Sequence, residues 1–222
     1  MSAPDQHRTL DWLFRYDPAM VDPVLRDATQ VRYMTVGDHF VERALHTWAP
    51  DLYSFPFLSR AFVDYLVWLG DAVGRWEPAP GDDYGAPELR LRSISPGLED
   101  VLAALLERHV NPVLRRLYLG AYEVGWMQPP FLIRYDMHRQ QDMDLHYDGQ
   151  SELTIAVALN DSFEGGHLEF PRQGFRSDVV PIGHALVFPG SVSHLHRALA
   201  IRQGERRALT IWTRREQPTE TV

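Results

Sequence analysis

Residues 143–160 read MDLHYDGQSELTIAVALN, and the fold is inferred outward from this stretch. In its second half, bulky apolar side chains alternate with small or polar ones. Side chains of a β-strand alternate between the two faces of a sheet, and β-branched residues favour that conformation. The pattern predicts a strand with one bulky apolar face (Leu153, Ile155, Val157 and Leu159) and one small or polar face (Thr154, Ala156, Ala158 and Asn160).

This strand belongs to a series of short β-like segments that begins near residue 129. Turn signals rich in Gly, Pro and Asn-Asp separate the segments. Many short strands with frequent turns predict a β-sandwich or barrel, of which the jelly roll is one form. The predicted strands are Phe131–Tyr135, Met143–Asp148, Leu153–Leu159, His167–Phe170, His184–Phe188, His194–Leu199 and Arg207–Thr213.

The last predicted strand repeats the division into two faces. Leu209 and Ile211 share one face, and the other face carries Arg206, Ala208, Thr210 and Trp212. The bulky faces suit packing under helices, and the small or polar faces suit a cavity that holds a polar ligand. A sheet with one core face and one solvated face would also alternate in this way, so alternation alone leaves both interpretations open.

The first half of the chain is expected to be mainly helical. Apolar residues recur at helical spacing in 59–73 and again after Ser95-Pro96, a pair typical of a helix start, with a kink expected at Pro112. Between these helices, the Pro- and Gly-rich residues 76–87 are expected to form a surface loop or a lid.

These elements predict an α+β protein with helices on the outer face of a jelly-roll core. The length of 222 residues suits one domain with a sizeable core. We therefore expect a single domain over 1–222, in which 1–128 is mainly helical support and 129–215 is the catalytic core.

The composition excludes several kinds of site. The chain has no cysteine, which removes disulfides, iron–sulfur clusters, thiolate zinc sites and thiol nucleophiles. It also has no lysine, because all 22 basic residues are arginines, so a Schiff-base or P-loop lysine is excluded. Any anion held by a cationic side chain must be held by Arg or His. The net charge of −8 argues against broad binding to nucleic acid.

No apolar stretch reaches the length of a membrane span, and the first residues lack the apolar core of a secretion signal. A cytoplasmic location, without membrane association, is the simple expectation.

The strongest chemical pattern combines His146-Tyr147-Asp148 with a later histidine, His194 or His196. On a strand, residues two apart point to the same side, so an imidazole and a carboxylate there can reach one ion. Two imidazoles and one carboxylate form the facial triad of non-haem Fe(II) sites, which leaves positions open for co-substrate and oxygen. An isolated His-x-Asp pair also occurs by chance on protein surfaces.

Arg206 and Trp212 follow the second histidine along the chain. A dicarboxylate that chelates iron through its keto-acid end needs a fixed cation for its far carboxylate, and arginine provides a bidentate one. The alternative is an exposed charge at a strand end, since Arg207 is the next residue.

Taken together, these motifs resemble the catalytic domain of prolyl 4-hydroxylases and procollagen lysyl hydroxylases, with the lysyl type the more similar. The resemblance covers roughly Phe131 to Arg214. It implies a double-stranded β-helix fold, Fe(II), 2-oxoglutarate and O2 as requirements, and decarboxylation of 2-oxoglutarate to succinate and CO2. The matching segments are His146-Tyr147-Asp148, Thr154–Asn160, Phe163–Gly166, Phe188-Pro189-Gly190, His194-Leu195-His196 and Gly204-Glu205-Arg206.

By this resemblance, His146, Asp148 and His196 match the metal ligands, and Arg206 matches the residue that pairs with the distal carboxylate of 2-oxoglutarate. His196 is preferred because its interval to the arginine matches the family, whereas His194 is expected on the same face, in support of the ligands. The remaining members of the predicted co-substrate pocket are Tyr135, Thr154 and Trp212.

The family resemblance also bears on the reaction type. Related halogenases carry a smaller residue where this chain has Asp148, so hydroxylation is expected. The expected substrate is an amino acid, a lysyl or prolyl residue of a peptide, or a small natural product. Two other functions stay open, namely a zinc-dependent hydrolase on the same ligands and a metal-free jelly-roll binding protein. A homodimer and a contribution from ascorbate are left open.

The acidic residues around the His-x-Asp segment allow two interpretations. Asp142, Asp144 and Glu152 could form an acidic wall for a cationic substrate, or they could belong to a solvated loop beside a strand. The solvated loop is the favoured interpretation.

Overall fold

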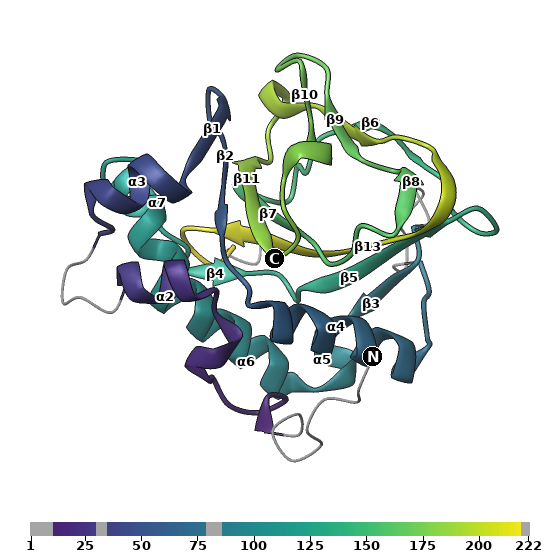
Figure 1. Ribbon diagram of the computed structural model, residues 1–222, viewed down its shortest axis with the longest axis horizontal. Coiled ribbons are helices and arrows are strands. Elements are labelled where there is room, and N and C mark those ends of the chain that lie inside the picture. Colours follow the sequence, from purple (N-terminus) through teal and green to yellow (C-terminus); the bar gives the residue numbers. More distant parts are fainter. Residues whose placement is uncertain (1–10, 30–34, 79–85, 219–222) are drawn as a thin grey trace.

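The computed structural model describes residues 11–29, 35–78 and 86–218, which form two antiparallel sheets and a set of helices (Figure 1). The strands are β1 (His46–Ala49), β2 (Leu52–Pro56), β3 (Glu88–Arg90), β4 (Trp126–Met127), β5 (Phe131–Asp136), β6 (Met143–His146), β7 (Leu153–Ala158), β8 (Phe163–Gly165), β9 (Leu168–Phe170), β10 (Phe175–Arg176), β11 (His184–Pro189), β12 (His196–Ala198) and β13 (Ile201–Arg214). The helical segments are η1 (Pro18–Met20), α2 (Pro23–Thr29), α3 (Asp38–Ala44), α4 (Arg60–Val73), α5 (Leu91–Ile94), α6 (Pro96–Leu105), η2 (Leu106–Val110), α7 (Asn111–Leu117), η3 (Ser177–Val179) and η4 (Val192–His194).

The two sheets face each other, as a jelly roll requires. The larger sheet has the order β1-β2-β11-β7-β13-β5-β3, and β4 and β8 also pair with β13. The smaller sheet has the order β10-β9-β12-β6. Figure 1 shows the smaller sheet on one side of the larger sheet and the helices on the other. The α+β fold with a jelly-roll core and outer helices is confirmed.

The bulky faces of β7 and β13 lie under the helices. Ile155, Val157, Leu209 and Ile211 are all fully buried and belong to one core cluster with residues of α4, α6 and α7. Burial of this apolar surface is the main stabilising contribution to the packing of the helical layer. The opposite faces of the same two strands are thereby turned toward the smaller sheet.

Both predicted helices are present, and each begins directly after a serine cap. The Ser59 hydroxyl accepts a hydrogen bond from the Phe62 amide (3.2 Å) at the start of α4, and Ser95 accepts one from the Gly97 amide (3.2 Å) at the start of α6. The irregularity expected at Pro112 is a π-helical turn, η2, immediately before α7. A proline near the start of α7 cannot donate to the preceding turn, and the wider turn accommodates it.

Several local expectations need correction. The first half is mainly helical, as expected, but it also supplies β1, β2 and β3 to the larger sheet, which the sequence did not predict. The strand predicted as Met143–Asp148 ends at His146, and His194 belongs to η4 instead of a strand. A short strand is shaped by its neighbours as much as by its own pattern, and its ends are therefore hard to place.

The predicted surface loop at 76–87 lies partly outside the described residues. Of its described part, Trp76 is buried, against the expectation of a surface loop. Glu77 and Glu88 exchange backbone hydrogen bonds (3.1 and 3.0 Å), which tie the two ends of the segment together. Among the described residues, no helix is both long and apolar enough to cross a membrane.

Candidate metal centre

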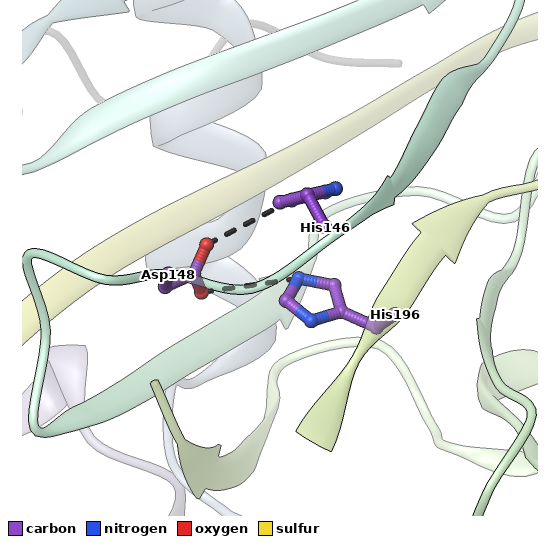
Figure 2. Close-up of side chains that lie close together, drawn as sticks. All are labelled: His146, Asp148 and His196. Carbon is purple, nitrogen blue, oxygen red and sulfur yellow. Dashed lines mark ion pairs between the residues drawn. The ribbon is translucent and has the colours of Figure 1, made fainter. Parts of the chain in front are cut away.

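Three predicted ligands meet between β6 and β12. His146 is the last residue of β6, His196 is the first of β12, and the two are paired across the strands. Asp148 lies two residues beyond the end of β6, and its carboxylate oxygens are 3.8 Å from Nε2 of each histidine. Figure 2 shows the three side chains converging, and their nearest ligand atoms lie within 4.8 Å of one another. This spacing is compatible with one shared metal ion.

Hydrogen bonds orient both imidazoles toward this point. Nδ1 of His146 donates to the Asp144 carbonyl (2.7 Å), and Nδ1 of His196 donates to the His194 carbonyl (3.0 Å). A carbonyl only accepts, so each Nδ1 carries the proton and each Nε2 presents a lone pair. Burial lowers the pKa of His196 from its usual value, which favours the neutral form that binds metal.

Further contacts fix the side chains of Asp148 and His196. The Thr154 hydroxyl donates to Oδ2 of Asp148 (2.6 Å). The ring of Phe170 stacks on His196 (5.1 Å between centroids), and the ring of Phe188 meets it edge-on (4.8 Å). Asp148 and His196 are buried, with exposed fractions of 7% and 4%. Two neutral imidazoles and one buried carboxylate are the donor set of non-haem Fe(II) sites, and they leave the ion a net positive charge for anionic co-ligands.

His194 does not join this group. Its ring is buried and Nε2 donates to the Pro50 carbonyl (3.1 Å), away from the three ligands, while its backbone carbonyl orients His196. The expectation that the two histidines share a face is wrong, because His194 is the last residue of η4 and only His196 belongs to β12. The choice of His196 as the member of the metal-binding group agrees with this geometry.

The three ligands open onto a cavity of about 790 Å³ between the sheets. The small and polar faces of β7 and β13 line it, so the cavity interpretation of their alternation is the correct one. All four residues predicted for the co-substrate are in its wall, and the wall also contains residues that sequence reasoning did not identify. The predicted residues are Tyr135, Thr154, Arg206 and Trp212, and the additional ones include Glu88, Arg90, Phe131, Ile133, Met143 and Leu168.

Arg206 is the buried cation of this cavity. It is 6% exposed, its guanidinium lies over the Tyr135 ring (5.4 Å), and its Nη1 has no hydrogen-bond partner among the described residues. Burial lowers the pKa of Arg206 from its usual value, but an arginine still remains protonated. An unpartnered buried N–H of a charged group is costly, so this wall of the cavity is built for an anion.

Trp212 and Thr154 are direct partners across β13 and β7. The indole Nε1 of Trp212 is buried without a hydrogen-bond partner in the described part of the chain. Arg207, the neighbour of Arg206, points the other way and pairs with Asp71 of α4 (2.6 Å). The structure thus separates the two adjacent arginines into a cavity residue and an outer-face residue.

Comparison with known proteins agrees with this site. Residues 131–214 match the family model described as the 2OG-Fe(II) oxygenase superfamily. Residues 131–214 thus belong to the 2OG-Fe(II) oxygenase superfamily. They include the three candidate ligands and Arg206. The resemblance to prolyl and lysyl hydroxylases is confirmed.

Curated relatives of this chain include procollagen lysine hydroxylases. A multifunctional procollagen lysine hydroxylase and glycosyltransferase of Caenorhabditis elegans is 28% identical, over 82% of this chain and 27% of the relative. A procollagen lysyl hydroxylase and glycosyltransferase of Acanthamoeba polyphaga mimivirus is 30% identical, over 70% of this chain and 18% of the relative. The chain thus spans about a quarter or less of the length of these relatives.

Solved structures similar to this chain include a Pseudomonas putida prolyl-4-hydroxylase, with a TM-score of 0.55 and 19% identity over 87% of this chain and all of that chain (100%). A viral collagen prolyl hydroxylase from Paramecium Bursaria Chlorella virus-1 has a TM-score of 0.54 and 18% identity, over 73% of this chain and 94% of the other. These likenesses confirm the fold.

Proposed function

We propose that the chain is an Fe(II)- and 2-oxoglutarate-dependent dioxygenase that hydroxylates an unactivated C–H bond. In the overall balance, substrate, 2-oxoglutarate and O2 give hydroxylated substrate, succinate and CO2. The observation that carries the proposal is the placement of His146, Asp148, His196 and the unpartnered guanidinium of Arg206 in the wall of one cavity.

The first task of the protein is to hold the ion in a fixed arrangement. His146, Asp148 and His196 each offer one ligand atom, and their Nδ1 and Thr154 contacts fix the orientation of these atoms. When bound, iron supplies the activation of O2 and the redox chemistry. The Asp148 carboxylate occupies the ligand position that halogenases leave for halide, so hydroxylation is the proposed outcome.

The second task is to position the co-substrate. Arg206 pairs with the distal carboxylate of 2-oxoglutarate, and Tyr135 lies under its guanidinium. Trp212 and Thr154 form the adjoining part of the wall near the ligands. The low exposure of Arg206 keeps water from competing for the carboxylate, which strengthens the pairing.

The proposed substrates are an amino acid, a lysyl or prolyl residue of a peptide, or a small natural product. The names of the procollagen lysine hydroxylases support the amino acid side chain as the target. A Trichoplax adhaerens prolyl hydroxylase with the same fold (TM-score 0.54) was solved with a peptide fragment of hypoxia inducible factor, which supports peptides as candidates. The cytoplasmic location and a homodimer stay predictions of the sequence.

The test is succinate release by purified protein with Fe(II), 2-oxoglutarate and O2, in the presence of candidate amino acids and peptides. Asp148→Ala should abolish it, whereas Asp144→Ala should not, because the Asp144 side chain is exposed and its backbone carbonyl, which accepts from His146, is kept in the variant. Both variants should keep the far-UV circular dichroism of the wild type. Hydrolytic turnover that requires Zn(II) and leaves 2-oxoglutarate unconsumed would favour the hydrolase instead.

A further inference from the structure

Two charged residues of β3 share the cavity with the candidate metal ligands. β3 is the edge strand of the larger sheet and pairs with β5, so that Glu88 lies opposite Ile133 and Arg90 opposite Phe131. All four residues line the cavity of about 790 Å³. Residues two apart on a strand share a face. A three-residue strand thus contributes one negative and one positive side chain to the wall that faces the substrate space.

The two side chains form an ion pair. Nη2 of Arg90 lies 2.9 Å from Oε2 of Glu88, and the Glu88 side chain is only 6% exposed. The Arg90 side chain is 33% exposed, its guanidinium lies over the Phe131 ring (4.7 Å), and its Nη1 donates to the Pro129 carbonyl (3.3 Å). The carboxylate is thus sheltered in the wall, and the guanidinium remains partly open at the rim.

Packing alone does not account for this arrangement. Removal of a carboxylate and a guanidinium from water is costly, and apolar residues of similar size often stabilise a fold as well or better. The residues of β5 that pair with Glu88 and Arg90 are Ile133 and Phe131, so the wall of the cavity next to the ion pair is apolar. Charged groups at a cavity with a reactive centre are candidates for ligand recognition.

The pair differs in role from Arg206. Arg206 is 6% exposed, and its Nη1 has no hydrogen-bond partner among the described residues. Its positive charge therefore suits the binding of an anionic group. Arg90 is already neutralised by Glu88. A neutral pair best matches a ligand that carries both charges itself, because each charge then gains a partner and none is left buried alone.

We infer that Glu88 and Arg90 bind the α-ammonium and α-carboxylate groups of a free amino acid, and that this amino acid is the hydroxylation substrate. The inference rests on the proposed function and narrows its substrate class. A residue inside a peptide chain lacks both charges and would leave the pair unmatched. Arg90 takes the carboxylate of the substrate, as Arg206 takes that of the co-substrate, and Glu88 takes the ammonium.

The first arm of the test changes the ligand and leaves the protein intact. The standard L-amino acids are screened for stimulation of succinate release by the wild-type protein, and each active one is compared with its α-amide and its Nα-acetyl form. Loss of either charge should lower kcat/KM by about 10- to 100-fold, the effect of one charge-assisted hydrogen bond. Calorimetric titration of the same compounds into protein loaded with Mn(II) and 2-oxoglutarate should give the same order of affinities.

The second arm changes the protein. In Arg90→Gln, the ratio of kcat/KM for the free amino acid to that for its α-amide should fall to about one. In Glu88→Gln, the ratio for the free amino acid to its Nα-acetyl form should fall likewise. A substitution that removes the effect of changing one group of the ligand indicates that the two groups are in direct contact. Arg90→Lys should restore part of the preference for the acid. Arg92→Gln is the matched control, because its side chain is 65% exposed outside the cavity, and it should behave as the wild type.

The outcomes separate the two claims. Absence of iron-dependent succinate release from the wild type under every condition would defeat the proposed function itself. Release that is stimulated by peptides or capped residues as well as by free amino acids would overturn only the inference on Glu88 and Arg90. The same holds if Arg90→Gln keeps the wild-type ratio of acid to amide. If Glu88→Gln fails to fold, the comparison of ligands on the wild type still decides the matter.

Discussion

Replacement of Arg206 by alanine tests the co-substrate site most sharply. Nη1 of Arg206 is buried without a hydrogen-bond partner in the described structure, and the side chain is 6% exposed. A bidentate pair with a carboxylate consists of two charge-assisted hydrogen bonds, each worth about 1.5–3 kcal/mol. Loss of both should weaken 2-oxoglutarate binding by about 3–6 kcal/mol, which raises its KM by roughly 10²- to 10⁴-fold.

The assay is succinate release as a function of 2-oxoglutarate concentration, together with anaerobic Fe(II) titration. Iron affinity should stay near that of the wild type, because none of the described contacts links Arg206 to the three ligands. Arg207→Gln is the control, since Arg207 pairs with Asp71 on the outer face. A wild-type KM for 2-oxoglutarate in Arg206→Ala, or an equal rise in Arg207→Gln, would refute the assignment.

Three further changes test the support of the site and the fold. Thr154→Val removes the 2.6 Å hydrogen bond to Asp148 and should weaken Fe(II) binding about 10- to 100-fold in anaerobic titration, whereas an unchanged affinity would contradict the role of the threonine. Gly190→Ala would place Cβ 2.2 Å from the Ser151 carbonyl oxygen and 2.6 Å from that of Asp148, so it should lower both Tm and Fe(II) affinity. The control Gly37→Ala has nothing within 4 Å and should leave Fe(II) affinity unchanged, with a smaller fall in Tm because Gly37 is the N-cap of α3. Burial, together with the charges of Arg108 and Arg26, lowers the pKa of His109 from 6.5 to about 4. Between these two pH values the imidazole is protonated in the unfolded chain but neutral in the folded one. The free energy of unfolding should therefore fall by up to about 3 kcal/mol as the pH drops through this range. Urea unfolding should show a flatter pH dependence for His109→Gln, and equal slopes would count against this account.

The sequence predicted the features that depend on local periodicity. The alternation in β7 and β13 indicated which side chains face the helices and which face a cavity, because a strand has only two faces. The spacing of His146 and Asp148 indicated one imidazole and one carboxylate on a shared side, and the resemblance to hydroxylases selected His196 over His194 and predicted a co-substrate role for Arg206. The structure brings the three ligands and Arg206 to one cavity.

The remaining features depend on contacts between distant segments. β3 has three residues directly after a turn-rich stretch, and it pairs with β5, so neither Glu88 nor Arg90 stood out in the sequence. His194 and His196 are equivalent by type, and only the η4 turn directs one toward Pro50 and the other toward the ligands. Asp148 lies two residues beyond the end of β6. The spacing of His146 and Asp148 fits this arrangement as well as a continuous strand, so the sequence could not tell which of the two occurs.

The most direct test of the central claim is the amount of Fe(II) that the protein binds under nitrogen, measured by equilibrium dialysis. The account predicts one ion per chain for the wild type, since one three-residue group is present among the described residues. It predicts none at the same concentration for His196→Ala. Equal iron content in the wild type and His196→Ala, both with intact folds, would contradict it.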